Sequence, residues 1–314
     1  MKALIIGGSG FVGSYLIQEL QEAWGWQVEI TKLPSESCPL KTVEVYDLDI
    51  TDKEAVSSLL AKVQADYIFH LAAMSSVSLS WKNPGLTVDI NIKGTLNVLD
   101  ALKDSKIHSR LILIGSGEEY GHILPGELPL RESNHVRPGN LYAATKAFQN
   151  MAGRIYQEAY NLDIISVRAF NHIGPRQLPT FVVSDFCKQI AEIECGLKDP
   201  LMKVGNLSAR RDFTDVRDVV RAYVLLAQKG VSGETYNVGT GTAYPIQHIL
   251  DSLLDLSKVQ IEVASDPVKM RPVDVPEIAA DISKLQSATG WTPRYGLPQT
   301  LSDTLDYWRD TVRS

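Results

Sequence analysis

A glycine-rich turn near the first residue constrains the fold more than any other feature of the sequence. Ala3 to Ile6 form a short apolar run typical of a buried strand. Glycines follow at even spacing, and the apolar side of a helix begins at Tyr15. This order of strand, glycine turn and helix is typical of dinucleotide binding, because a diphosphate must touch backbone amides where a Cβ would be in the way. The pattern predicts a Rossmann-type α/β fold with a doubly wound parallel sheet; an ordinary glycine-rich turn is the alternative.

Strands and helices are expected to alternate along the first half of the chain, which favours a parallel sheet. The strands are expected near 28–31, 43–46, 67–71, 110–114 and 164–170, and the helices near 53–64, 86–104 and 141–160. After residue 171 the pattern changes, although a helix at 216–228 and a strand at 234–238 indicate a return to the large sheet. Helices at 184–197, 245–256, 282–289 and 297–311, with a strand at 260–264, predict a smaller α/β unit.

The sequence therefore predicts two interleaved domains closing over one cleft. Residues 1–170 plus 212–239 are expected to form the dinucleotide-binding domain, and residues 171–211 plus 240–314 a discontinuous C-terminal substrate domain. With 314 residues, of which 44% are hydrophobic, the chain can bury a core of this size.

Charge and cysteine content exclude several classes of partner. The formal net charge is −6 and there is no basic stripe, so neither nucleic acid nor an anionic membrane is expected as a partner. Three cysteines, Cys38, Cys187 and Cys195, form neither a disulfide framework nor a metal site, which favours a reducing compartment. The apolar run at the start ends at Gly7, too early for a signal peptide or a membrane span. We expect a cytoplasmic protein without a metal.

Tyr142 and Lys146 lie four residues apart in a helical stretch, which places the phenol and the ammonium on the same face. An ammonium beside a phenol is expected to lower the phenol's pKa toward working pH, as general acid–base chemistry requires. Ser116 follows the strand at 110–114, at the edge of the sheet where open α/β sheets bind ligands. By itself the tyrosine–lysine spacing occurs in ordinary amphipathic helices. Together with the glycine turn and Ser116, it predicts a catalytic group.

The end of the second strand indicates the cofactor. An acid at this place accepts a hydrogen bond from the ribose 2′-hydroxyl of NAD. The sequence reads Thr31-Lys32-Leu33-Pro34, with Glu29 too early in the strand to substitute. A threonine and a lysine suit a 2′-phosphate better, so NADPH is predicted to be preferred, with NADH possible and a solvated surface lysine as the alternative.

Four later segments identify the family that the sequence resembles. They are Phe170-Asn171-His172-Ile173-Gly174-Pro175, Val204-Gly205-Asn206-Leu207, Arg211-Asp212-Phe213-Thr214-Asp215 and Met270-Arg271-Pro272-Val273-Asp274-Val275-Pro276. With the glycine turn and the Ser-Tyr-Lys set, the sequence resembles an extended short-chain dehydrogenase/reductase of the nucleotide-sugar branch over essentially its whole length. GDP-mannose 4,6-dehydratases and GDP-4-keto-6-deoxy-D-mannose reductases fit best.

The resemblance implies the site residues. Cofactor contacts are implied for Gly7, Gly10, Phe11, Val12, Gly13, Lys32, Asp49, Ile50, Leu71, Ala72, Ala73, Tyr142 and Lys146. Contacts to a GDP-sugar are implied for Ser75, Ser76, Asn171, Asn206, Arg211 and Arg271, the arginines holding phosphates. Simpler alternatives stay open: Asp49 as a helix cap, the serines in a solvated loop, and each arginine in a surface ion pair.

For the reaction, the resemblance implies NADPH-dependent reduction of the 4-keto group of GDP-4-keto-6-deoxy-D-mannose to GDP-D-rhamnose, with Tyr142 as proton donor. Glu118 matches the glutamate base of the dehydratases, but Gly117 and the Phe11-Val12 pair depart from their pattern. A dehydratase, or another 4-reductase or 4-epimerase, remains an alternative. A noncatalytic nucleotide sensor, the other class of function, typically loses the tyrosine or the lysine, and both are present here.

The same resemblance implies a homodimer. In this superfamily two long helices of each subunit form a four-helix interface, and the matching stretches are 86–104 and 141–160. Packing of both helices on their own sheet is the alternative. Asn91, on the first of these helices, is predicted to be a structural asparagine and not a catalytic one.

Overall fold

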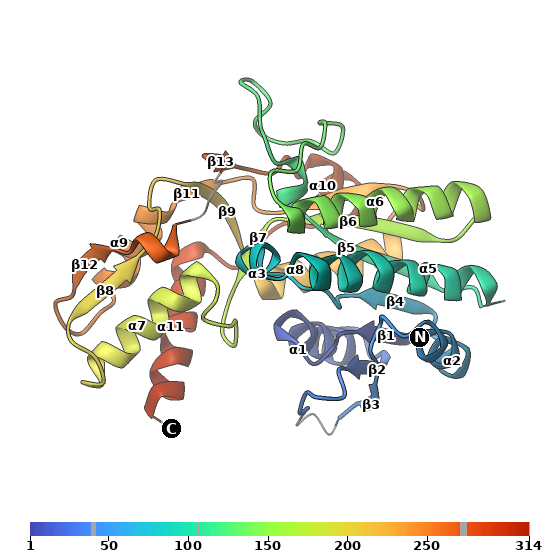
Figure 1. The fold of residues 1–314 in the computed structure, drawn as a ribbon, viewed down its shortest axis with the longest axis horizontal. Helices are drawn as coiled ribbons and strands as arrows, with labels where there is room; N and C mark the ends of the chain where they lie inside the picture. Colours follow the sequence, from blue (N-terminus) through green and yellow to red (C-terminus); the bar gives the residue numbers. More distant parts are fainter. Residues whose placement is uncertain (39–41, 106, 271–274, 314) are drawn as a thin grey trace.

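A computed structural model describes residues 1–38, 42–105, 107–270 and 275–313. Its largest element is a parallel sheet of seven strands in the order β10-β6-β5-β4-β1-β2-β3 (Figure 1). The strands are β1 (Lys2–Ile6), β2 (Gln27–Lys32), β3 (Glu44–Asp47), β4 (Tyr67–His70), β5 (Arg110–Ser116), β6 (Ile164–Ala169) and β10 (Thr235–Val238). The chain starts at β1, inside the sheet, adds β2 and β3 on one side and the remaining strands on the other, which confirms the predicted doubly wound Rossmann topology.

Helices cover both faces of this sheet because successive strand residues point to opposite sides. Ala3 and Ile5 pack with α1 (Phe11–Gln18) and α8 (Val216–Lys229). Leu4 and Ile6 pack on the other face. The helices there are α2 (Lys53–Val63), α5 (Thr95–Asp104) and α6 (Leu141–Tyr160). The sheet is thus buried on both faces, as its nearly continuous apolar strands require.

The helical stretch expected at 86–104 contains an irregularity. It consists of α4 (Pro84–Val88), a π-helical turn η2 (Asp89–Gly94) and α5, and α3 (Val77–Lys82) precedes it. Asn91 lies in the π turn and is buried. Its amide accepts a hydrogen bond from the Met74 N–H at 2.8 Å and donates to the Met74 carbonyl at 3.1 Å and to the Thr145 hydroxyl at 3.0 Å. The Asn91 amide is thus satisfied, as expected of a structural asparagine, and that it takes no part in catalysis stays a prediction.

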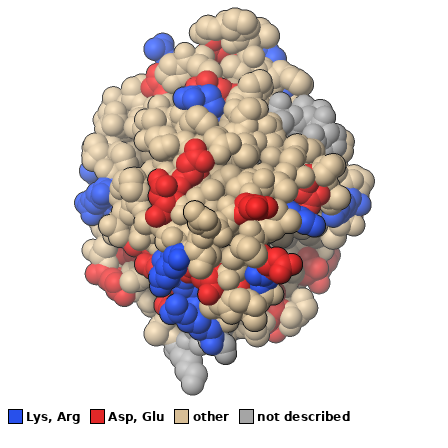
Figure 2. Space-filling model, turned by 90° about the vertical axis from the view of Figure 1, so that its left-hand side faces the viewer, with Lys and Arg blue, Asp and Glu red and all other residues tan. Residues whose placement is uncertain are grey.

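A smaller unit lies beside the sheet, at the left of Figure 1. Its strands form a four-stranded sheet of β7 (Asn171–Ile173), β9 (Arg210–Asp215), β11 (Ala243–Pro245) and β13 (Glu277–Ile278), and a pair of β8 (Leu201–Val204) and β12 (Glu262–Ser265). Its helices are α7 (Val182–Glu194), α9 (Ile246–Asp255) and α11 (Leu297–Arg313), which share one apolar core. The outer face of this unit carries acidic and basic side chains interspersed (Figure 2).

One expected element lies elsewhere. The helix expected at 282–289 was assigned to the small unit, but α10 (Ser283–Thr289) packs against α8 and β10 of the large sheet. Leu285 and Trp291 are fully buried in the core on the α1–α8 face. That assignment is wrong, because the apolar side of this helix finds its partners on the sheet and not in the small unit.

Short irregular elements complete the fold. They are the π turn η1 (Glu19–Ala23) and the 3-10 turns η3 (Gly117–Tyr120) and η4 (Pro267–Lys269). The long connection between η3 and α6 is tied down by single bridges from Gly121 to Arg137 and from Leu130 to Ala280. The second bridge joins this connection to the segment that follows β13, so it fixes the two units to each other.

Candidate active site

The glycine turn is built by close backbone contacts. The N–H groups of Gly7 and Gly8 donate to the side chain and the carbonyl of Thr31, at 3.0 and 2.9 Å. A Cβ on Gly13 would collide with the Gly8 carbonyl, so helix α1 can approach the turn only with glycine there. At Gly10 a Cβ would have nothing within 3.5 Å, its nearest neighbour being the Gly7 carbonyl at 3.7 Å.

The start of α1 fits the diphosphate of a dinucleotide. Gly10 is its N-cap, and within the described residues no side chain caps this helix end and no acid stands in its first turn. The first N–H groups of the helix therefore remain available to an anion, which the helix dipole also favours. The residues present fit the cofactor that the sequence predicts.

The predicted loop after β4 and the first residues of α1 lie beside this turn. The Leu71 and Ala72 N–H groups donate to the Ile6 carbonyl, and a Cβ on Gly7 would come within 2.7 Å of the Ala72 nitrogen. Val12 is partly buried against the core of the α1–α8 face. Phe11 stacks on the His172 ring with centroids 6.2 Å apart, an arrangement that the sequence analysis missed.

The end of β2 differs from expectation. Lys32 forms an ion pair with Asp47 at the end of β3. The turn after β2 folds back, so that Glu36 accepts a hydrogen bond from the Ser9 hydroxyl of the glycine turn at 2.7 Å. The strand end itself carries no acid, as the sequence indicates, but the turn brings an acid from four residues further along the chain against the glycine turn.

The other residues implied at the adenosine end have structural contacts. Asp49 accepts from the N–H and the hydroxyl of Thr51, at 2.9 and 2.7 Å, whereas the cap of the following helix α2 is Asp52. Ile50 is buried, and a Cβ on Gly94 would come 2.6 Å from its Cγ1. Contact of either residue with the cofactor stays a prediction.

Ser116, Tyr142 and Lys146 come together at the carboxyl edge of the sheet. Ser116 ends β5, and Tyr142 lies in the first turn of α6, whose N-cap Asn140 accepts from the Ala143 N–H at 2.8 Å. The Ser116 hydroxyl lies close enough to the Tyr142 phenol to act on its pKa. The exposed fractions of Ser116, Tyr142 and Lys146 are only 7%, 8% and 4%, so the group is shielded from bulk water.

The electrostatics of this group differ from the sequence prediction. Burial raises the pKa of the Tyr142 phenol, and the carboxylates of Glu118 and Glu119 act in the same direction, while the nearby Ser116 hydroxyl lowers it. The Lys146 ammonium donates instead to the Ile114 carbonyl at 2.7 Å and to Gln149 Oε1 at 3.0 Å. The expectation that Lys146 lowers the phenol's pKa is thus wrong for this arrangement.

Lys146 itself is perturbed. Burial lowers the pKa of its ammonium to about 8, and the nearby Glu119 carboxylate limits the decrease. A lysine in this state loses its charge within the range of an ordinary pH profile. The charge of the site therefore depends on pH through Lys146.

Glu118 lies next to the Ser116 and Tyr142 pair. Its N–H donates to the Ser116 hydroxyl at 3.2 Å, and its carboxylate accepts from the Asn140 amide at 3.3 Å. Because it also raises the pKa of Tyr142, its carboxylate is electrostatically coupled to the phenol. A base at this place can act on a ligand bound beside Tyr142.

The residues implied for the sugar nucleotide are less uniform. Ser75 is exposed, and Ser76 accepts from the Leu79 N–H as the N-cap of α3. Asn171 is in β7, a strand of the small unit. Asn206 accepts two hydrogen bonds from Ser208. Arg211 is buried and donates to the Arg210 and Val275 carbonyls. Arg271 lies outside the described residues. Their substrate roles stay predictions.

Sequence reasoning missed a polar layer beneath the catalytic group. Gln149 donates to the Ile114 carbonyl at 3.1 Å, and Glu119 pairs with Arg168 at 3.0 Å. One signal was present, because Arg168 is a charged residue inside a strand that is otherwise apolar. Such a residue requires a buried partner.

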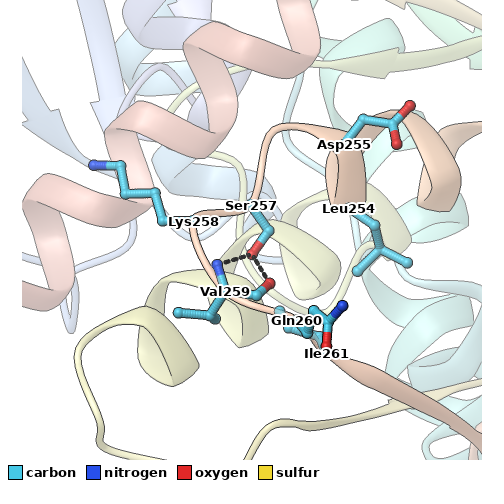
Figure 3. A pocket seen from close by; sticks show the side chains of 7 residues that line it. All are labelled: Leu254, Asp255, Ser257, Lys258, Val259, Gln260 and Ile261. Atoms are coloured by element: carbon cyan, nitrogen blue, oxygen red, sulfur yellow. Dashed lines mark hydrogen bonds between the residues drawn. The ribbon is translucent and has the colours of Figure 1, made fainter.

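Other features of the described residues are remote from this chemistry. A surface hollow in the small unit is lined by residues 254–261, where the Ser257 hydroxyl bonds both backbone groups of Val259 (Figure 3). It is formed by one turn of the chain and contains none of the predicted site residues. No metal-ligand cluster occurs in the described ranges, and none of their helices has the length and apolarity needed to cross a membrane.

A Rossmann sheet that carries a serine, a tyrosine and a lysine at its carboxyl edge is the arrangement of a short-chain dehydrogenase/reductase. The profile of the GDP-mannose 4,6 dehydratase family matches residues 4–304. The chain therefore belongs to this family, in the extended branch of those enzymes.

Individual relatives span several reactions. The GDP-6-deoxy-D-mannose reductase of Pseudomonas aeruginosa is 31% identical over 99% of this chain and 98% of its own. The solved structure of RMD from the same organism, complexed with NADPH, matches with a TM-score of 0.88 at 30% identity, covering 99% and 100% of the two chains. The UDP-glucose 4-epimerase of Thermotoga maritima, solved with UDP-glucose, matches at 0.90 with 28% identity and coverages of 99% and 100%. Relatives thus include dehydratases, reductases and epimerases of nucleotide sugars.

Proposed function

We propose that this enzyme reduces the 4-keto group of GDP-4-keto-6-deoxy-D-mannose to give GDP-D-rhamnose, with NADPH as the reductant. The observation that carries the proposal is the buried group of Ser116, Tyr142 and Lys146 at the end of β5 and the start of α6. Full-length similarity to a GDP-6-deoxy-D-mannose reductase supports the choice of substrate.

Each residue of the site has its own role in the proposed reaction. NADPH, when bound, supplies the hydride. The Ser116 hydroxyl orients the sugar ketone together with the Tyr142 phenol, and Tyr142 donates its proton to the ketone oxygen. A phenol whose pKa is raised by burial stays protonated at neutral pH, so it is available as the acid. The Lys146 ammonium does not bond the phenol in this arrangement and instead holds the Ile114 carbonyl, on the strand that ends at Ser116.

We also propose that NADPH is preferred over NADH. The NADPH complex of the Pseudomonas aeruginosa relative and the position of Lys32 at the end of β2 support this preference. Because Asp47 pairs with Lys32 and Glu36 lies against Ser9, a 2′-phosphate has to compete with two carboxylates. The preference is therefore expected to be several-fold and not absolute.

Product analysis tests the proposed reaction. Purified protein given the 4-keto-6-deoxy compound should consume one NADPH for each ketone reduced, and protein given GDP-mannose alone should form no keto sugar. A matched control is Tyr142→Phe, which should abolish the NADPH consumption. Accumulation of the keto sugar from GDP-mannose would overturn the proposal.

The dehydratase reaction is the second candidate, and the position of Glu118 favours it. Its carboxylate is coupled to Tyr142 and held by Asn140, where a base could remove a proton from the sugar. Glu118→Gln separates the two candidates. This change should leave ketone reduction within about tenfold of wild type in a reductase, and should remove turnover by roughly two orders of magnitude or more in a dehydratase.

We further propose that the protein is a cytoplasmic homodimer with a GDP-sugar as its partner molecule. The sparse free cysteines support the compartment. Exposed apolar side chains on α4 and α6 support the dimer, because Leu86, Met151 and Ile155 are each at least half exposed.

A further inference from the structure

Glu119 is a fully buried carboxylate directly beneath the catalytic group. One oxygen accepts the Ser116 N–H at 2.8 Å, and the other accepts from Arg168 Nε at 3.0 Å and from the Asn150 amide at 3.3 Å. Arg168 also donates to the Tyr120 hydroxyl at 3.1 Å and to the Glu132 carbonyl at 3.2 Å. Burial raises the pKa of this carboxyl, whereas Arg168 and the Ser116 N–H lower it, so its donors favour the ionised form.

The backbone of β5 is shaped to admit this carboxylate. A Cβ on Gly115 would collide with Glu119 Oε1 and would lie 2.7 Å from the Val167 carbonyl. Glycine is therefore needed immediately before Ser116 because Glu119 folds back under the strand. Ser116 in turn caps η3 in a reciprocal capping box with Glu119.

Two opposite charges hold neighbouring peptide groups at the end of β5. Lys146 donates to the Ile114 carbonyl, and Glu119 accepts the Ser116 N–H. Gln149 joins the lysine side of this arrangement, and Asn150, on the next turn of α6, joins the carboxylate side. The direction in which Ser116 faces Tyr142 depends on both contacts.

The charge of Glu119 also acts on Lys146. The titratable groups that face Lys146 are Glu119 from η3 and His70 from β4, while Tyr142 lies on the same helix. Burial lowers the pKa of His70 to about 3, so it is neutral at working pH. Glu119 raises the pKa of Lys146 against the effect of burial, and Arg168, on β6, faces Glu119 itself.

We propose that Glu119, paired with Arg168, is a positioning residue that fixes the Ser116 backbone and places a counter-charge near the buried Lys146 ammonium. Its catalytic consequence rests on the proposed reduction, but its effect on Lys146 does not. Without the carboxylate, the pKa of Lys146 should fall. The pKa of Tyr142 should fall as well, because Glu119 raises it too. Reduction needs both groups protonated, so its alkaline limit should move to lower pH.

The test uses two variants of the full chain. Glu119→Gln removes the charge but leaves Arg168 without its acid, which can prevent folding. Glu119→Leu with Arg168→Met replaces the pair with apolar side chains of similar size, a change that buried ion pairs often tolerate. ¹³C NMR of labelled lysines follows Lys146, with its signal assigned from Lys146→Ala, and requires neither substrate nor cofactor.

In the wild type, Lys146 should titrate with a pKa of about 8. In either variant this value should fall by roughly half a unit to one unit or more. The alkaline limb of kcat for ketone reduction should move by the same amount, with KM for the sugar nearly unchanged. Glu119→Asp retains the charge, so its Lys146 pKa and the alkaline limb of its kcat should both stay close to those of the wild type.

A second buried pair provides the control. Glu194 and Arg309 in the small unit are similarly shielded, and replacing them with Leu and Met should leave the titration of Lys146 unchanged. An unchanged Lys146 titration in the Glu119→Leu, Arg168→Met protein overturns the proposal. A shifted titration in a protein that reduces no 4-keto sugar would instead overturn the proposed reaction and leave the role of Glu119 standing.

Discussion

Replacing Tyr142 with Phe removes a single oxygen from a side chain that is 8% exposed. The fold should lose little, because one buried hydrogen bond contributes only about 0.5–1.5 kcal/mol net and Ser116 retains its bond from the Glu118 N–H. Turnover should lose much more. A positioned general acid contributes about 10²- to 10⁴-fold, which corresponds to roughly 3–5 kcal/mol of barrier.

Single-turnover kinetics with the 4-keto sugar, and fluorescence titration with NADPH, measure the two quantities separately. We expect kcat to fall by at least about 10²-fold while the Kd for NADPH changes less than about threefold. Tyr223→Phe is the matched control. This buried tyrosine on α8 has a hydroxyl without a hydrogen-bond partner among the described residues, so its removal should leave turnover unchanged and stability equal or slightly higher. Reduction by Tyr142→Phe at near wild-type rate would refute the assignment of the proton donor.

Three further predictions follow from surface, cofactor and core residues. The protein should sediment as a dimer. The double variant Met151→Glu, Ile155→Glu should sediment as a monomer, because these side chains are 55% and 60% exposed on α6. A monomeric wild type at micromolar concentration would contradict the prediction. The value of kcat/KM should be several-fold higher with NADPH than with NADH, and Lys32→Ala should lower this preference. An unchanged preference would show that Lys32 does not contact the 2′-phosphate. The pKa of His70 is about 3 in the folded chain against 6.5 in the unfolded chain. The fold stability that its neutral imidazole contributes is therefore present above pH 6.5 and is lost as pH falls toward 3. Unfolding titrations should show about 2 kcal/mol of this loss between pH 8 and 5, and His70→Leu should flatten it.

Much of the fold follows from local patterns in the sequence. The apolar run before Gly7 and the alternation of strands and helices predict the parallel sheet, because each signal lies within a few residues. The grouping of Ser116, Tyr142 and Lys146 could be predicted for the same reason, since a strand end and a helical spacing of four residues fix their places. Topology then brings them together.

Features that depend on distant contacts could not be predicted. The raised pKa of Tyr142 comes from burial, which its own neighbours in sequence do not reveal. Glu119 and Arg168 are 49 residues apart and meet only because β5 and β6 are adjacent. The return of α10 to the large sheet depends on Trp291, whose indole N–H donates to the Asp218 carbonyl at 3.0 Å. Motifs indicate which residues matter, but not which charges face them.

The junction of β9 and α8 has a consequence for engineering. β9 belongs to the small unit and ends at Asp215, and α8, which packs on the large sheet, begins at Val216. Asp215 is the N-cap of α8, and its carboxylate also accepts the Thr300 hydroxyl of α11 at 2.7 Å. The small unit is therefore not a cassette that can be cut out and exchanged between relatives. A chimaera would have to transplant separate stretches in register and join them at this residue, so selectivity is more accessible to point substitution than to recombination.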